Sequence, residues 1–144
     1  MSPKPISVYK LPSDEEMTIL FENMNSIAVV GLSPKPYRLS HRVAKHMQKF
    51  GFDIIPVRPA VTEILGKKAY KSLQMIALQI DVVNIFRSRK NVAEIIDQCI
   101  DRKVKTIWLQ EGVVDEESAV KACNANILTI MDKCIYKEYV RLMK

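Results

Sequence analysis

The sequence lacks the features that would place it in a membrane or in a disulfide framework. No apolar run approaches the ~20 residues that a membrane-spanning helix needs. Residues 1–5 contain a lysine but no apolar segment follows it, so no signal peptide is expected. Cys99, Cys123 and Cys134 are an odd number of cysteines without C-x-x-C spacing, which favours reduced thiols over a disulfide framework or a zinc site. We therefore expect a cytoplasmic protein.

Several motifs of catalysis are also missing. No G-x-S-x-G motif is present, and no cysteine and histidine spacing fits a metal site. His41 and His46 stand five positions apart, which on a helix separates their side chains by about 140°, so we interpret both as surface or packing residues. Glycine is scarce, and two of the four glycines, Gly31 and Gly112, follow predicted strands. That placement favours tight turns or a close approach of the backbone to a ligand.

The charge is moderately basic and dispersed. The chain has 22 Lys and Arg against 16 Asp and Glu, for a formal net charge of +6. This excess favours an anionic partner such as a phosphorylated small molecule, nucleic acid or a membrane surface. Because no basic run reaches five residues, nucleic acid and membrane are disfavoured. The length predicts a single domain over 1–144, with the proline-rich residues 1–12 as an N-terminal arm.

Apolar runs alternate with helical periodicities along the chain. Ser13 and Glu16 form a capping-box pattern before a helix predicted over 14–24, and Gly51 ends a second helix over 39–50. We predict further helices over 73–77, 91–101, 115–123 and 136–143, strands over 26–31, 54–57, 81–86, 106–110 and 127–130, and a loop over 58–72. This order predicts an α/β, Rossmann-like three-layer αβα sandwich with a five-stranded parallel sheet.

Basic and polar residues follow the predicted strands, where ligands bind in open α/β sheets. Residues 27–40 pass from an apolar strand through Gly31 into a helix start, a junction whose backbone N–H groups suit a phosphate. The loop lacks the second and third glycines of G-x-G-x-x-G, which argues against an ordinary dinucleotide dehydrogenase. The cations expected to converge at this rim are Lys35, Arg38, Arg58 and Arg87.

Arg58, after the second predicted strand, bears on the class of cofactor. An NAD site has Asp or Glu at this position to accept the ribose hydroxyls. Arginine instead pairs with a phosphate, so NADP and coenzyme A, which are both phosphorylated on the ribose, fit better than NAD. The alternative is that Arg58 is simply an exposed side chain.

Six stretches, taken in order, resemble the small single-domain CoA-binding proteins, a Rossmann-type family related to the CoA-binding domain of the succinyl-CoA synthetase α subunit. These stretches are residues 29–33 with Arg38 and Ser40, 55–59, 62–66, 82–87, 108–112 and 131–138. The resemblance covers roughly residues 14–140, and it departs from the family pattern at Arg58, where the family has Asn. The catalytic histidine, second domain and partner subunit of the synthetase are not apparent here, so ligase activity is not carried over.

The resemblance implies a coenzyme A site on the carboxyl rim of the sheet. Phosphate would meet the turn of Gly31, Leu32 and Ser33, with Lys35, Arg38 and Ser40 nearby. The adenosine end would be flanked by Val57, Arg58 and Pro59. The next strand would border the nucleotide with Phe86, Arg87 and Val92. The far side would be closed by Gln110, Glu111 and Gly112.

These observations predict a non-catalytic binding or regulatory module for coenzyme A or an acyl-CoA. One alternative is an NADP-dependent, oxidoreductase-like nucleotide-binding protein. Another is a thiol-regulated protein that forms a mixed disulfide with coenzyme A through Cys134, which stands at a predicted strand end beside Lys133. A nucleic-acid binder ranks last, and a homo-oligomer is left open.

Overall fold

The computed structural model describes residues 5–144, so the first four residues of the predicted arm lie outside the described residues. The helices are α1 (Asp14–Asn23), α2 (Leu39–Lys49), α3 (Arg89–Arg102), α4 (Glu116–Asn124) and α5 (Ile135–Met143), with a 3₁₀ turn η1 (Leu73–Met75). The main strands are β1 (Ser26–Val30), β2 (Asp53–Val57), β5 (Val82–Ile85), β6 (Thr106–Leu109) and β7 (Leu128–Met131). A small antiparallel hairpin consists of β3 (Glu63–Ile64) and β4 (Lys67–Lys68).

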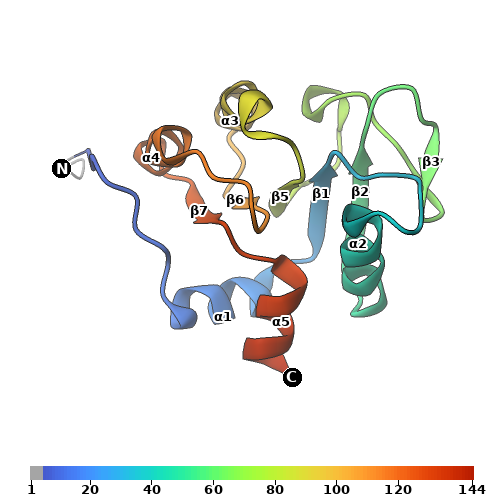
Figure 1. Cartoon of the computed structure of the whole chain (residues 1–144), viewed down its shortest axis with the longest axis horizontal. Helices are drawn as coiled ribbons and strands as arrows, with labels where there is room; N and C mark the ends of the chain where they lie inside the picture. The colour runs from blue at the N-terminus through green and yellow to red at the C-terminus, as the bar shows by residue number, and fades with distance from the viewer. Residues whose placement is uncertain (1–4) are drawn as a thin grey trace.

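The main sheet is parallel throughout and has the order β2-β1-β5-β6-β7. The chain crosses from β1 to β2 in one direction and then returns to place β5 on the other side of β1. The carboxyl ends of β1 and β5 therefore form the switch point, where doubly wound sheets bind ligands. Helices cover both faces of the sheet (Figure 1). The predicted α/β three-layer sandwich with a five-stranded parallel sheet is confirmed.

Each face of the sheet has its own apolar core. On β1, Ile27 and Val29 pack towards α1, α2 and α5, whereas Ala28 and Val30 pack towards α3 and η1. This alternation follows from the two-residue period of a strand, and it requires apolar residues at every position when both faces are covered. Trp108 of β6 is fully buried in the first core, and its indole N–H donates to the Lys133 carbonyl at 2.8 Å.

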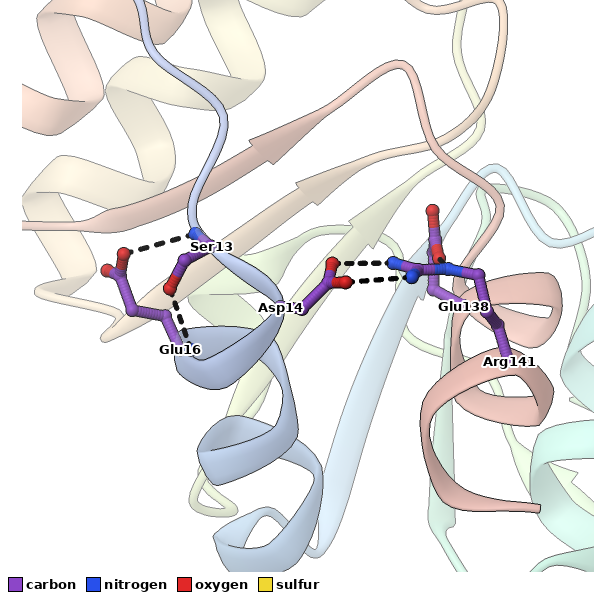
Figure 2. Close-up of polar contacts among 5 residues, drawn as sticks. All are labelled: Ser13, Asp14, Glu16, Glu138 and Arg141. Atoms are coloured by element: carbon purple, nitrogen blue, oxygen red, sulfur yellow. Dashed lines mark hydrogen bonds and ion pairs between the residues drawn. The ribbon is translucent and has the colours of Figure 1, made fainter.

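The first and last helices are fastened to each other at one end of the molecule (Figure 2). Ser13 and Glu16 form the capping box predicted for α1, with both reciprocal hydrogen bonds at 3.1 Å. Arg141 of α5 donates two hydrogen bonds to the Asp14 carboxylate, at 2.8 and 2.9 Å, and one to Glu138 at 2.6 Å. The start of α1 and the C-terminal helix α5 are thereby joined through side chains.

The predicted loop over 58–72 differs from the structure because it contains the β3–β4 hairpin. Its two turn residues, Leu65 and Gly66, both have positive φ, 55° and 73°, as a two-residue primed turn requires. Leucine rarely adopts this conformation, so the turn gave no recognisable signal. The predicted helix over 73–77 is only the 3₁₀ turn η1. No helix within residues 5–144 is long and apolar enough to cross a bilayer.

Candidate nucleotide-binding site

Gly31 ends β1 at the switch point, and its surroundings admit no side chain. Its N–H donates to the Val57 carbonyl at 3.0 Å, and its φ is +89°. A Cβ at this position would lie 2.5 Å from the Phe86 carbonyl oxygen and 2.9 Å from Arg87 Cδ. The backbone of Phe86, the residue after β5, therefore packs closely against Gly31, and the approach of a ligand there stays a prediction. Gly112 has the same φ, but a Cβ added there would meet nothing within 4 Å, so only the backbone conformation favours glycine.

Ser33 holds the loop after Gly31 with three hydrogen bonds, two to the first turn of α2 and one within the loop. Its N–H donates to Ser40 Oγ at 2.9 Å, and its hydroxyl accepts from the Lys35 N–H at 3.1 Å. Its carbonyl lies 2.9 Å from His41 Nδ1, which must carry the proton because a carbonyl can only accept. His41 is buried and is thus a packing residue, whereas His46 is exposed. The loop is held in a fixed shape beside the helix N-terminus.

The N-terminus of α2 differs from those of α1 and α4. Arg38 is its N-cap residue, makes no capping hydrogen bond, and is followed by no acidic residue in the first turn. By contrast, α1 and α4 are capped by Ser13 and Asp115 and carry acidic residues in their first turns. Acidic residues in the first turn interact with the positive end of the helix dipole from within the chain. At α2 no such residue and no cap is present, so the N-terminal N–H groups and the dipole are available to an external anion.

A cleft of about 440 Å³ opens beside this helix start, and we call it the anion cleft. Its lining consists of Gly31, Ser33, Lys35, Arg38, Leu39, Ser40, Arg58 and Phe86. Three of these residues are cations and none is a carboxylate, so the field inside the cleft is positive. Arg58 reaches across from the end of β2, and its guanidinium lies 3.5 Å from the Leu32 carbonyl. Of the four cations expected to converge, the structure brings Lys35, Arg38 and Arg58 together here, whereas Arg87 lines the neighbouring cleft described next.

A second cleft of about 220 Å³, which we call the α3 cleft, lies on the other side of Gly31. Its lining is Val30, Gly31, Val57, Pro59, Lys71, Ser72, Leu73, Arg87, Asn91, Glu94, Ile95 and Gln98. Aliphatic side chains and Pro59 share the lining with cations, amides and one carboxylate. The lining residues that come from η1, from the turn before η1 or from α3 were not predicted from the sequence. Because Gly31 lines both clefts, they meet over the carboxyl end of β1.

Some predicted site residues line neither cleft. These are Leu32, Val92, Gln110, Glu111, Gly112 and Cys134. Leu32 and Val92 are fully buried in the two cores. The Gln110 Oε1 accepts hydrogen bonds from Asn84 Nδ2 at 3.3 Å and the Ile135 N–H at 3.4 Å, while its Nε2 is buried without a partner.

The remaining unplaced residues belong to the β6 and β7 ends of the rim. Glu111 forms an ion pair with Lys137 at 2.9 Å, and the Gly112 N–H donates to Asp132 at 2.7 Å. Cys134 is the N-cap residue of α5 and is buried in the core beneath that helix. These strands lie one and two positions beyond β5, so their ends are farther from the switch point than the two clefts are.

The buried thiol of Cys99 lies in the other core, away from both clefts. Burial raises the pKa of this thiol to about 12, which keeps it protonated and unreactive at neutral pH. Among the described residues, no group of three or more His, Cys, Asp or Glu side chains is arranged to hold a metal ion.

A doubly wound parallel sheet with a basic cleft at its switch point defines a nucleotide-binding domain of the Rossmann type. The sequence pattern of the CoA binding domain family matches residues 25–140. The chain therefore belongs to the CoA-binding domain family, which confirms the resemblance found in the sequence. This membership supports coenzyme A binding and gives no support to NADP.

The chain is also similar to individual sequences and solved structures. The chain is 40% identical over 124 residues to the uncharacterized protein YneT of Bacillus subtilis, across 86% of this chain and 92% of that protein. It is 33% identical over 111 residues to the alpha subunit of the ADP-forming acetate–CoA ligase II of Pyrococcus furiosus, of which it spans only 24%. A hypothetical protein from Pyrococcus horikoshii superimposes with a TM-score of 0.89 at 31% identity, covering 96% of this chain and all of that one.

Proposed function

We propose that the chain binds coenzyme A or an acyl-CoA across the carboxyl rim of the sheet, as a binding or regulatory module without catalysis of its own. The observation that carries this proposal is the meeting of two unlike clefts at Gly31, one cationic and one partly apolar. Coenzyme A has two matching parts, because its charged diphosphate adjoins an adenosine that combines an apolar purine face with a 3′-phosphate. The ligand then runs over β1 from one face of the sheet to the other.

The diphosphate occupies the anion cleft in this arrangement. Lys35 and Arg38 supply positive charge on the loop and at the start of α2, and Arg58 supplies it from the end of β2. The uncapped N-terminus of α2 adds backbone N–H groups and a partial positive charge. These features support a phosphate site, because charge-assisted hydrogen bonds to fixed donors are the strong ones.

The adenosine occupies the α3 cleft. Its aliphatic lining, with Pro59 and Leu73, suits the faces of a purine ring, and the amides of Asn91 and Gln98 suit its polar edge. Lys71 and Arg87 are the cations of this cleft, and we assign them to the ribose 3′-phosphate. This assignment predicts a preference for coenzyme A over its 3′-dephospho form.

The lining of the two clefts supports a role in binding. Among the described residues that line them, Glu94 is the one carboxylate, and no cysteine or histidine is present. Nucleophilic catalysis requires an activated nucleophile beside a base, and these linings contain no such pair. Cys134 lies outside both clefts and is only 6% exposed, so a mixed disulfide through this thiol would need the start of α5 to move.

Isothermal titration calorimetry tests the proposal. We expect one coenzyme A per chain, with weaker binding of 3′-dephospho-CoA and NADP. Lys35→Gln and Arg38→Gln should each weaken coenzyme A binding about 10-fold, the equivalent of ~1.4 kcal/mol for one charged hydrogen bond. Lys49→Gln is the matched control, because Lys49 is an exposed lysine at the opposite end of α2.

Lys71→Gln separates the two halves of the site. It should weaken the binding of coenzyme A and leave that of 3′-dephospho-CoA unchanged, so that the preference between them shrinks. Absence of coenzyme A binding, or NADP binding as tightly, would refute the proposed function. An equal loss for both CoA forms in Lys71→Gln would refute only the assignment of the 3′-phosphate.

A further inference from the structure

The strand β7 forms one edge of the sheet, and residues 5–12 run alongside it without joining it (Figure 1). Within the described chain, these residues make no backbone-to-backbone hydrogen bond to β7. Their contacts with the edge and with α4 instead use side chains. An edge strand presents a row of unpaired backbone groups, so what these side chains do at the edge matters for association.

The phenol of Tyr9 takes the place of a partner strand. Its hydroxyl donates to the Thr129 carbonyl at 2.9 Å and accepts from the Met131 N–H at 3.0 Å. Residues 128 and 132 direct their N–H groups to the β6 side, where they meet Lys105 and Leu109, so residues 129 and 131 direct theirs outward. One side chain therefore satisfies two outward-facing backbone groups of the edge.

A second set of contacts holds the arm to α4. The Asn124 side-chain amide pairs with the backbone of Ile6, accepting from its N–H at 2.9 Å and donating to its carbonyl at 3.1 Å. The Tyr9 N–H also donates to the Glu116 carboxylate at 3.4 Å. The arm otherwise packs loosely on the surface, since Ile6 is 42% and Val8 is 68% exposed. A cavity of about 360 Å³ separates residues 10–13 from β7 and Cys123.

The sequence of β7 itself carries no protection against pairing. Its residues 128–131 are Leu-Thr-Ile-Met, without a charge or a proline. The opposite edge strand β2 contains Pro56 and is covered by a backbone bridge to Tyr70. Edge strands usually avoid pairing through a charged residue, a proline or a covering segment. Because β7 has neither a charge nor a proline, its protection comes only from the covering residues 5–12.

We propose that residues 5–12 are a removable cover that prevents β7 from pairing with β7 of a second copy of this chain. Two identical uncharged edges pair antiparallel about a two-fold axis, the commonest symmetry of homo-oligomers. Release of Tyr9 frees the Thr129 carbonyl and the Met131 N–H, the groups that such a pair would use. The cover is independent of the coenzyme A site, because neither cleft includes a residue of the arm or of β7.

The test compares the full wild-type chain with Tyr9→Phe, which retains the ring, and with the double variant Tyr9→Phe/Asn124→Ala. Tyr37→Phe is the matched control, because Tyr37 is 68% exposed and far along the chain from the arm. Light scattering gives the mass from dilute to concentrated solution, and hydrogen exchange follows the Met131 amide. Circular dichroism verifies that each variant is folded.

We expect the double variant to approach twice the wild-type mass as it is concentrated, and Tyr9→Phe to follow in part. In the double variant, the Met131 amide should exchange with solvent quickly in dilute solution and become protected from exchange as the protein is concentrated. A mass equal to that of the wild type at every concentration would overturn the proposal. So would a heavier species whose Met131 amide still exchanges fast, because association would then use another surface. An amide as protected in the dilute double variant as in the wild type would also overturn the proposal, because Tyr9 would then not be what covers the edge.

Discussion

Gly31 and Gly112 have the same φ of +89° but differ in what surrounds them. At Gly112 an added Cβ meets open space, so Gly112→Ala should destabilise the fold by about 1 kcal/mol, the ordinary penalty for a left-handed non-glycine residue. At Gly31 the same change also drives a carbon into the Phe86 carbonyl, and we expect a loss of about 3 kcal/mol or more. Urea unfolding of both variants measures the difference. Equal losses would show that β5 moves aside without strain.

Some residues of the candidate site could be predicted from the neighbouring sequence, and others could not. Lys35, Arg38 and Arg58 directly follow strands that could be recognised, and the rule for open α/β sheets then places them on one rim. No local sequence pattern predicts Lys71 as a site residue. It lies at the α3 cleft because the backbone bridge between Val57 and Tyr70, which follows the unpredicted β3–β4 hairpin, brings the chain back to the end of β2. Such a contact depends on the path of the loop in space, which local propensity does not encode.

A signal for the rest of the α3 cleft was present in the sequence but was not used. Asn91, Glu94, Ile95 and Gln98 recur at the spacing of one helix face, directly after the third predicted strand. The predictions at Gln110 and Cys134 applied the strand-end rule to β6 and β7, which lie beyond the switch point. The structure places both residues outside the two clefts, and a ligand contact at either stays a prediction.

At the scale of elements, α1 and α2 show opposite uses of a helix N-terminus. Ser13→Ala removes the capping box of α1 and should cost about 1 kcal/mol in unfolding free energy while coenzyme A affinity is unchanged. Arg38→Asp supplies the cap that α2 lacks, so it should stabilise the fold by about 1 kcal/mol and weaken coenzyme A binding. Urea unfolding and calorimetric titration of both variants report the two effects. If Arg38→Asp left affinity unaltered, the N-terminus of α2 would not be the phosphate site.

The strands β1 and β5 are joined at their starts by a carboxylate. Asp81 accepts hydrogen bonds from the N–H groups of Asn25 at 2.7 Å and Ser26 at 3.0 Å. Burial by itself would raise the pKa of this carboxyl, but the hydrogen bonds outweigh burial and hold the pKa below its ordinary value. A lowered pKa in the folded state means that the stabilisation is complete above the ordinary pKa and is lost as the pH falls through the lowered one.

Asp81→Asn should therefore be less stable than the wild type at neutral pH, by about 1–2 kcal/mol, because the charged acceptor is gone. The difference should narrow in acid and disappear once Asp81 of the wild type is protonated in the folded state. Urea unfolding at neutral and acidic pH measures it. A difference that does not change with pH would mean that the loss arises from altered packing and not from charge.

At the scale of the whole molecule, the first and last helices meet at a junction where Arg141 contacts two carboxylates of unlike exposure (Figure 2). The Asp14 side chain is 63% exposed and that of Glu138 is 11% exposed. Exposed ion pairs contribute little, whereas a buried carboxylate that loses its partner is strongly unfavourable. We therefore expect Arg141→Met, which keeps the aliphatic stem, to reduce stability more than Asp14→Asn does.

The loss in Arg141→Met should come mainly from the unpaired charge left on Glu138. The double variant Arg141→Met/Glu138→Gln should then be more stable than Arg141→Met alone, although it carries one change more. Urea unfolding of the four members of this double-mutant cycle measures the coupling between the two side chains. Additive losses would show that Arg141 and Glu138 are not coupled, which would leave packing contacts such as Phe21 against Tyr139, with ring centroids 5.2 Å apart, as the main link between the two helices.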